Sequence, residues 1–86
     1  MIITAELIQD LIVQGLPGCE AAVEGDGRHW YATVISEVFS GKSLLQQQRL
    51  VYGTLGERLT SGEIHALSVK TYTPDDWKKA QAPGSN

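Results

Sequence analysis

The chain has 86 residues, of which 42% are hydrophobic and 20% charged, and its formal net charge at pH 7 is −3. This length is too short for two stable cores and indicates one domain, over residues 1–80, with a flexible tail at 81–86. The acidic balance argues against a dedicated nucleic-acid binder, and the single cysteine excludes an internal disulfide. The sequence has neither a signal-peptide pattern nor the ~18 consecutive apolar residues of a membrane span, so we expect a soluble cytoplasmic protein that does not engage membranes.

The first predicted element is a helix over residues 4–15. Thr4 is a suitable N-cap, and Gly15 followed by Pro17 ends the helix. Apolar residues recur along one face at helical spacing, which indicates that this face packs on a core. They are Leu7, Ile8, Leu11 and Ile12.

Residues 19–34 predict a β-hairpin. Cys19, Ala21 and Val23 alternate with other residues at the period of a strand, and the stretch from Trp30 to Val34 alternates in the same way. Gly-Asp-Gly at 25–27 supplies residues that tolerate a tight connection. His29 falls at the turn, where the return strand begins.

A second helix is predicted to begin after Ser43, because Ser43 and Gln46 fit a capping box. Its apolar positions continue at helical spacing to residue 59. Gly53 and Gly56 lie inside this range and each weakens a helix by about 0.5–1 kcal/mol relative to alanine. We therefore expect close packing of this helix against another backbone at these two glycines.

A third strand is predicted in the stretch "IHALSVKTYTP", residues 64–74, with His65 on the same face as Val69. Thr73 then caps a short final helix, in which Trp77 is expected to fold back on the core. The order α-β-β-α-β-α, with one hairpin and one strand reached through a helix, indicates an α+β domain. Its three-stranded mixed sheet would have helices packed on one face.

His29 and His65 are the chain's only histidines, and both fall at strand ends that could converge. Imidazole binds iron, zinc and copper well. Two ligands leave a metal site half built, so any metal would be shared with another protein or a small molecule. The alternative is that both rings are structural or simply on the surface, which two histidines without a fixed short spacing do not exclude.

Other candidate chemistry is sparse. Cys19 could be a reactive thiol or a further ligand, but its phase with Ala21 and Val23 favours a small buried hydrophobic residue. Lys42 and Arg49, near the start of the second helix, could hold a phosphate, although a solvated helix start is the simpler interpretation. Because no catalytic arrangement is recognisable, we do not expect an enzyme.

Two blocks, "FSGKSLLQQQRLVY" and "IHALSVKTYTPDDW", resemble the BolA-like family in order and spacing. The resemblance covers nearly the whole chain, from the first helix to Trp77. "GDGRHW" in the hairpin is similar to the subgroup that has histidine rather than cysteine in this loop. One departure is Ser40, where the family often has an acidic residue before the glycine.

This resemblance implies an αββαβ(α) fold similar to class II KH domains. It also implies a partner, a monothiol CGFS-type glutaredoxin, with which the protein would form a heterodimer and share a [2Fe–2S] cluster. His65 matches the family's widely shared histidine ligand, and His29 matches its histidine-or-cysteine ligand. The glutaredoxin cysteine and the thiol of glutathione would complete the site. Imidazole ligands would raise the cluster potential, as in Rieske centres, and would make ligation depend on pH.

The resemblance leaves some questions open. We expect the glutaredoxin contact near His65, Lys70 and Trp77. The alternative function is a KH-like transcriptional regulator that binds DNA or other nucleic acid. The resemblance is compatible with both a monomer and a homodimer of the free protein. The basic residues that would contact nucleic acid are Lys42, Arg49, Lys70, Lys78 and Lys79.

Overall fold

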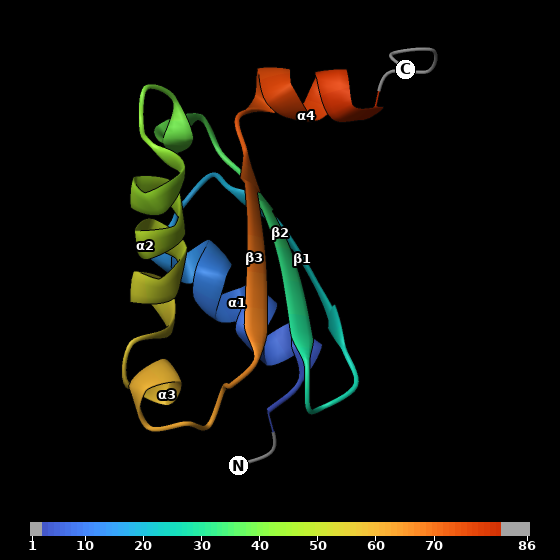
Figure 1. The fold of residues 1–86 in the computed structure, drawn as a ribbon, viewed down its shortest axis with the longest axis vertical. Helices are drawn as coiled ribbons and strands as arrows, with labels where there is room; N and C mark the ends of the chain where they lie inside the picture. Colours follow the sequence, from blue (N-terminus) through green and yellow to red (C-terminus); the bar gives the residue numbers. More distant parts are fainter. Residues whose placement is uncertain (1–2, 82–86) are drawn as a thin grey trace.

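A computed structural model describes residues 3–81 (Figure 1). The helices and strands are α1 (Ala5–Gly15), β1 (Glu20–Gly25), β2 (Trp30–Ile35), a 3-10 turn η1 (Glu37–Phe39), α2 (Leu44–Leu55), α3 (Glu57–Thr60), β3 (Leu67–Tyr72) and α4 (Pro74–Gln81). The predicted α+β fold and its αββαβ(α) order are confirmed, with η1 and α3 as short additions. Residues 82–86 of the predicted tail lie outside the described residues. None of the helices within residues 3–81 has the length and apolar character needed to cross a membrane.

The sheet is three-stranded and mixed, as predicted. Its strand order is β1-β2-β3, with β1 antiparallel and β3 parallel to the central strand β2. Trp30, the first residue of β2, pairs with Gly25 on one side and with Leu67 on the other. The register therefore places the first residues of β2 and β3 at the same end of the sheet, next to the β1–β2 turn.

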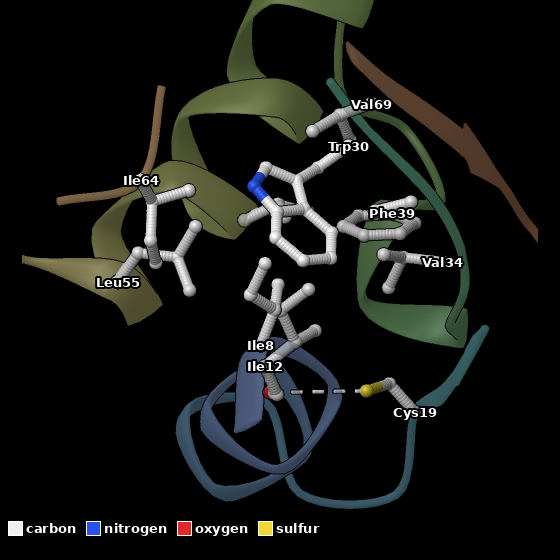
Figure 2. Packing of buried hydrophobic residues seen from close by; sticks show 11 residues of the cluster. Ile8, Ile12, Cys19, Trp30, Val34, Phe39, Leu55, Ile64 and Val69 are labelled. Carbon is white, nitrogen blue, oxygen red and sulfur yellow. Dashed lines mark hydrogen bonds between the residues drawn. The ribbon is translucent and has the colours of Figure 1, made fainter. Parts of the chain in front are cut away.

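One face of the sheet carries the core, and we call it the inner face. Trp30, Ala32 and Val34 alternate inward from β2 and are at most 4% exposed. Figure 2 shows the Trp30 ring among side chains from α1, α2 and η1, including Ile8 and Phe39. Full burial of such a side chain stabilises the fold by about 1.5–3 kcal/mol. The residues that alternate with them lie on the opposite face, which we call the outer face.

All three predicted helix starts are confirmed, that of α4 by the Asp76 N–H, which donates to Thr73 Oγ1 at 3.2 Å. Thr4 Oγ1 accepts a hydrogen bond from the Leu7 N–H at 3.1 Å, which caps α1. Ser43 Oγ accepts from the Gln46 N–H at 3.2 Å, and Gln46 Oε1 accepts from the Ser43 N–H at 2.9 Å. These two reciprocal bonds form the capping box that the sequence predicts for α2.

The predicted role of the glycines in the second helix is wrong. Gly56 has a φ of +53° and ends α2 at Leu55, so the helix does not continue to residue 59. A Cβ at Gly53 or Gly56 would meet nothing within 4 Å. The close approach occurs instead at Gly15 of α1, where a Cβ would lie 2.5 Å from Thr54 Cγ2 on α2.

Two further predictions near the C-terminal end need correction. β3 begins at Leu67, so His65 lies in the preceding loop and not within the strand. Trp77 does not reach the core. It lies half-buried with its ring edge-to-face against Tyr72, an outer-face residue, with ring centroids 5.2 Å apart.

Candidate metal centre

The parallel pairing of β2 and β3 brings His29 and His65 to the same end of the sheet. His29 directly precedes β2, and His65 lies two residues before β3. The Trp30 N–H donates to the Ala66 carbonyl at 3.1 Å, so the residues next to the two histidines are joined by a hydrogen bond. Both histidine side chains are exposed. The predicted convergence of the two strand ends is therefore present in the fold.

His29 is held by the turn that precedes it. Asp26 Oδ1 accepts hydrogen bonds from the backbone N–H groups of His29 and Arg28, each at 2.9 Å. The Asp26 N–H donates in return to the His29 carbonyl at 3.2 Å. The two donated bonds, that of His29 first, hold the pKa of the Asp26 carboxyl below its usual value. An ionised Asp26 thus fixes the His29 backbone at neutral pH.

His65 is positioned by its two neighbours. Ile64 is 1% exposed, and its N–H donates to the Arg58 carbonyl at 3.0 Å. Ala66 adopts the left-handed conformation, with a φ of +52°, which destabilises a non-glycine residue by roughly 1–2 kcal/mol. This conformation interrupts the strand alternation between His65 and Leu67. His65 therefore projects from a short segment fixed on one side by the core and on the other by the sheet.

The two imidazoles offer half of a coordination sphere. No hydrogen bond within residues 3–81 engages either ring. The same residues contain no group of three or more histidine, cysteine or acidic side chains arranged to hold a metal ion. A closed structural site needs about four ligands, so a metal held by these two histidines would need further ligands from a second molecule.

Cys19 is not part of this site. It is 8% exposed and precedes β1 at the end of the sheet away from His29, because the neighbouring Glu20 pairs with Ile35. Its Sγ lies 4.0 Å from the Ile12 carbonyl oxygen (Figure 2). Burial raises the pKa of the Cys19 thiol, which keeps it protonated at neutral pH. The interpretation as a small buried residue is confirmed.

The residues expected to contact a glutaredoxin are dispersed. Lys70 is exposed on the outer face of β3. Trp77 follows the far end of β3, so the whole strand separates it from His65 (Figure 1). These three residues do not form one compact patch.

The basic residues of the nucleic-acid alternative are brought together only in part. Lys42 and Arg49 line one shallow hollow of about 300 Å³ on α2. Lys78 and Lys79 lie on α4, and Lys70 lies on β3. The five residues therefore occupy separate elements and make no continuous basic stripe.

Two residues that matter for the site are absent from the sequence-based candidates. The sequence predicts Asp26 only as part of a turn, although an aspartate side chain commonly accepts hydrogen bonds from backbone N–H groups that follow it in a loop. Ala66 has no sequence signal, because left-handed φ values are predicted for glycine or asparagine and not for alanine. Asp26 fixes the backbone of His29, and Ala66 fixes the backbone next to His65.

Comparison with known proteins decides the family. A family model described as BolA-like protein matches residues 15–76, which include both histidines. The chain belongs to the BolA-like family. This BolA-like protein is 39% identical to the acid stress protein IbaG of Escherichia coli K12 over 72 residues, which cover 84% of this chain and 86% of IbaG.

Solved structures agree with this family. A BolA protein homologue from Coxiella burnetii superimposes with a TM-score of 0.80 at 43% identity, over 88% of this chain and 97% of that one. The BolA domain of SufE1 from Arabidopsis thaliana gives a TM-score of 0.70 at 32% identity, over 83% of this chain and 92% of that domain.

Proposed function

We propose that this BolA-like protein is a non-enzymatic adaptor that pairs with a monothiol CGFS glutaredoxin and co-ligates a [2Fe–2S] cluster, in iron–sulfur trafficking or iron and redox regulation. The observation that carries the proposal is the placement of His29 and His65, two exposed imidazoles at one end of the sheet with no third ligand among residues 3–81. The glutaredoxin cysteine and the glutathione thiol would supply the other two ligands.

When bound, the cluster supplies one-electron redox chemistry, and its potential rises with imidazole in place of thiolate because the net negative charge falls. The chain's own contribution is orientation. Asp26 fixes the backbone of His29, and Ile64 with Ala66 fixes that of His65. Ligands held in advance bind with a smaller loss of conformational entropy, which favours retention of a group at a site shared between two proteins.

The test is a titration of this protein into a monothiol glutaredoxin that already holds a glutathione-ligated [2Fe–2S] cluster, followed by visible absorption and circular dichroism. We expect a new spectrum that saturates at one-to-one stoichiometry. His65→Ala should weaken cluster retention while the far-UV spectrum of the protein stays unchanged.

Two variants sharpen the result. His29→Cys keeps a ligand at this position, so it should retain the cluster with a shifted spectrum, whereas His29→Ala should retain it poorly. Lys42→Ala, an exposed change just before α2 and outside the residues expected to contact the glutaredoxin, serves as the control and should behave as the wild type. If the double change His29→Ala/His65→Ala leaves the spectrum of the mixed complex unaltered, the proposal is wrong.

Nucleic-acid binding is the second candidate function. It is favoured by the hollow that Lys42 and Arg49 share, since residues 40–56 contain no acidic side chain. Binding there should weaken as salt rises. The slope of log K against the logarithm of the salt concentration should be about −0.9 for each duplex phosphate contacted. Lys42→Ala/Arg49→Ala should reduce both the affinity and this slope. Undetectable or salt-insensitive binding to duplex and single-stranded probes would remove this candidate.

A further inference from the structure

The outer face of the sheet is hollowed beside β1. One hollow of about 460 Å³ and another of about 390 Å³ adjoin there, because both are lined by Glu20, Ile35 and Trp77. Trp77 reaches this face from α4, where its ring rests against Tyr72. We call this continuous feature the β1 groove. It begins at the end of the sheet that lies away from His29 and His65.

The outer edge of β1 borders the groove and has no neighbouring strand. The reciprocal hydrogen bonding of Asp26 with His29 fixes which residues pair across the hairpin. Because the pairs alternate, the backbone N–H and C=O groups of Ala21, Val23 and Gly25 point away from β2. Such unpaired groups are a template for an added strand.

The other edge strand, β3, is less open to the addition of a strand. The Gln48 side-chain amide of α2 donates to the Val69 carbonyl of β3 at 3.3 Å, so a side chain of this protein already occupies a backbone group in the middle of that edge. Strand addition to this sheet is thus directed to β1.

The charge of the groove selects its occupant. Glu20, Glu24 and Glu37 line the two hollows, whereas Lys78 is the only basic residue among the described residues that line them. A third hollow of about 400 Å³ continues past Glu37 and adds Asp75. This acidic lining favours a cationic segment, and the half-buried Trp77 ring adds a surface on which an ammonium or guanidinium group binds.

A second copy of this chain fits the edge poorly. In an antiparallel β1–β1 pairing, the two registers that use most of the strand place Glu20 opposite either Glu24 or Asp26 of the other copy. Like charges directly opposite each other on a sheet are destabilising. The occupant is therefore a different molecule with the opposite charge.

We propose that the β1 groove binds an extended segment of a partner protein in which Lys or Arg alternates with apolar residues, added as a fourth strand along β1. Its cationic side chains lie on the outer face opposite Glu20 and Glu24. Its apolar side chains lie on the inner face beside Ala21 and Val23, which are partly buried against the core. The segment is recognised through the β-augmentation mode, in which backbone bonds give affinity and alternate side chains give specificity.

The experiment uses the whole metal-free protein, uniformly ¹⁵N-labelled, and two capped peptides, Lys-Val-Lys-Val-Lys and Glu-Val-Glu-Val-Glu. Addition of the lysine peptide should shift the amide signals of Ala21, Val23 and Gly25 and the indole N–H signal of Trp77. We expect the glutamate peptide to bind at least about tenfold more weakly, because its charges repel those of the groove. Glu20→Gln/Glu24→Gln should weaken the lysine peptide about threefold to tenfold, the range for the loss of two exposed ion pairs.

The matched control is Glu57→Gln/Glu63→Gln, which removes the same charge at a hollow near α3 and should leave the affinity unchanged. The proposal is overturned if neither peptide shifts the β1 signals, if the control weakens binding as much as the groove variant, or if the free protein sediments as a dimer whose β1 amide signals shift on dilution. Since no histidine takes part, these results are independent of the cluster proposal.

Discussion

The change Gly25→Ala tests how closely the hairpin is packed beside His29. A Cβ at Gly25 would collide with the His29 carbonyl oxygen and lie 2.5 Å from Cε3 and 3.1 Å from Cα of Trp30. A carbonyl in the hairpin and a ring that is 4% exposed cannot move away without disturbing their own contacts. Overpacking of this kind destabilises a protein by about 1–3 kcal/mol. Because the obstacles are backbone and a buried ring, we expect a loss of stability of about 2–3 kcal/mol.

The same substitution at Gly53 provides the control. Gly53 lies inside α2, and its Cβ would meet nothing within 4 Å. Gly53→Ala should therefore stabilise the protein by about 0.5–1 kcal/mol, because alanine is the better helix former. One chemical change is thus predicted to act with opposite signs at two positions.

Urea unfolding followed by far-UV circular dichroism measures both effects, provided that the m values of the variants match. Domains of this length have free energies of unfolding of roughly 4–13 kcal/mol, so a loss of about 2–3 kcal/mol is readily resolved. The reasoning is refuted if Gly25→Ala is as stable as the wild type or if Gly53→Ala is less stable.

Three further predictions concern the hairpin, the cysteine and the start of α2. Asp26→Ala should speed hydrogen exchange at the His29 amide, and Asp26→Asn, which keeps an acceptor, should restore part of the protection. The pKa of the Asp26 carboxyl is lowered in the fold, so its stabilising effect is present above the ordinary carboxyl pKa and is lost as the pH falls through the lowered value. Protection of the His29 amide from exchange should therefore decline in acid. Cys19 should react slowly with a thiol reagent in the native protein and rapidly in urea, and fast native labelling would contradict its burial. Ser43→Ala should lower stability by about 1 kcal/mol in thermal unfolding, and no change would mean that the capping box contributes nothing.

Much of the fold could be predicted because local rules and tertiary packing agree. The alternation from Trp30 to Val34 is the burial pattern of β2, and Thr4 and Ser43 cap the helices that follow them. The convergence of His29 and His65 also followed from the sequence. It needs only a parallel β2–β3 pairing, which a helical crossover between the strands favours.

What the sequence could not predict depends on contacts between distant segments. Gly56 ends α2 through a positive φ, but an isolated glycine in a helical pattern is equally compatible with a continuous helix. Ala66 is held in a left-handed conformation where it meets β2, and nothing in its type indicates this. Trp77 is a large apolar residue of the kind that usually packs in a core, yet the direction of α4 places its ring on the outer face.

The central claim is that His29 and His65 are cluster ligands, and nitrogen spectroscopy tests it most directly. The protein would be labelled with ¹⁵N at histidine only, combined with an unlabelled glutaredoxin holding the [2Fe–2S] cluster, reduced, and examined by pulsed electron–nuclear double resonance. We predict strong couplings from two ¹⁵N nuclei, one of which disappears in His65→Ala and the other in His29→Ala. If the reduced mixed complex shows no strong ¹⁵N coupling, this chain does not ligate the cluster.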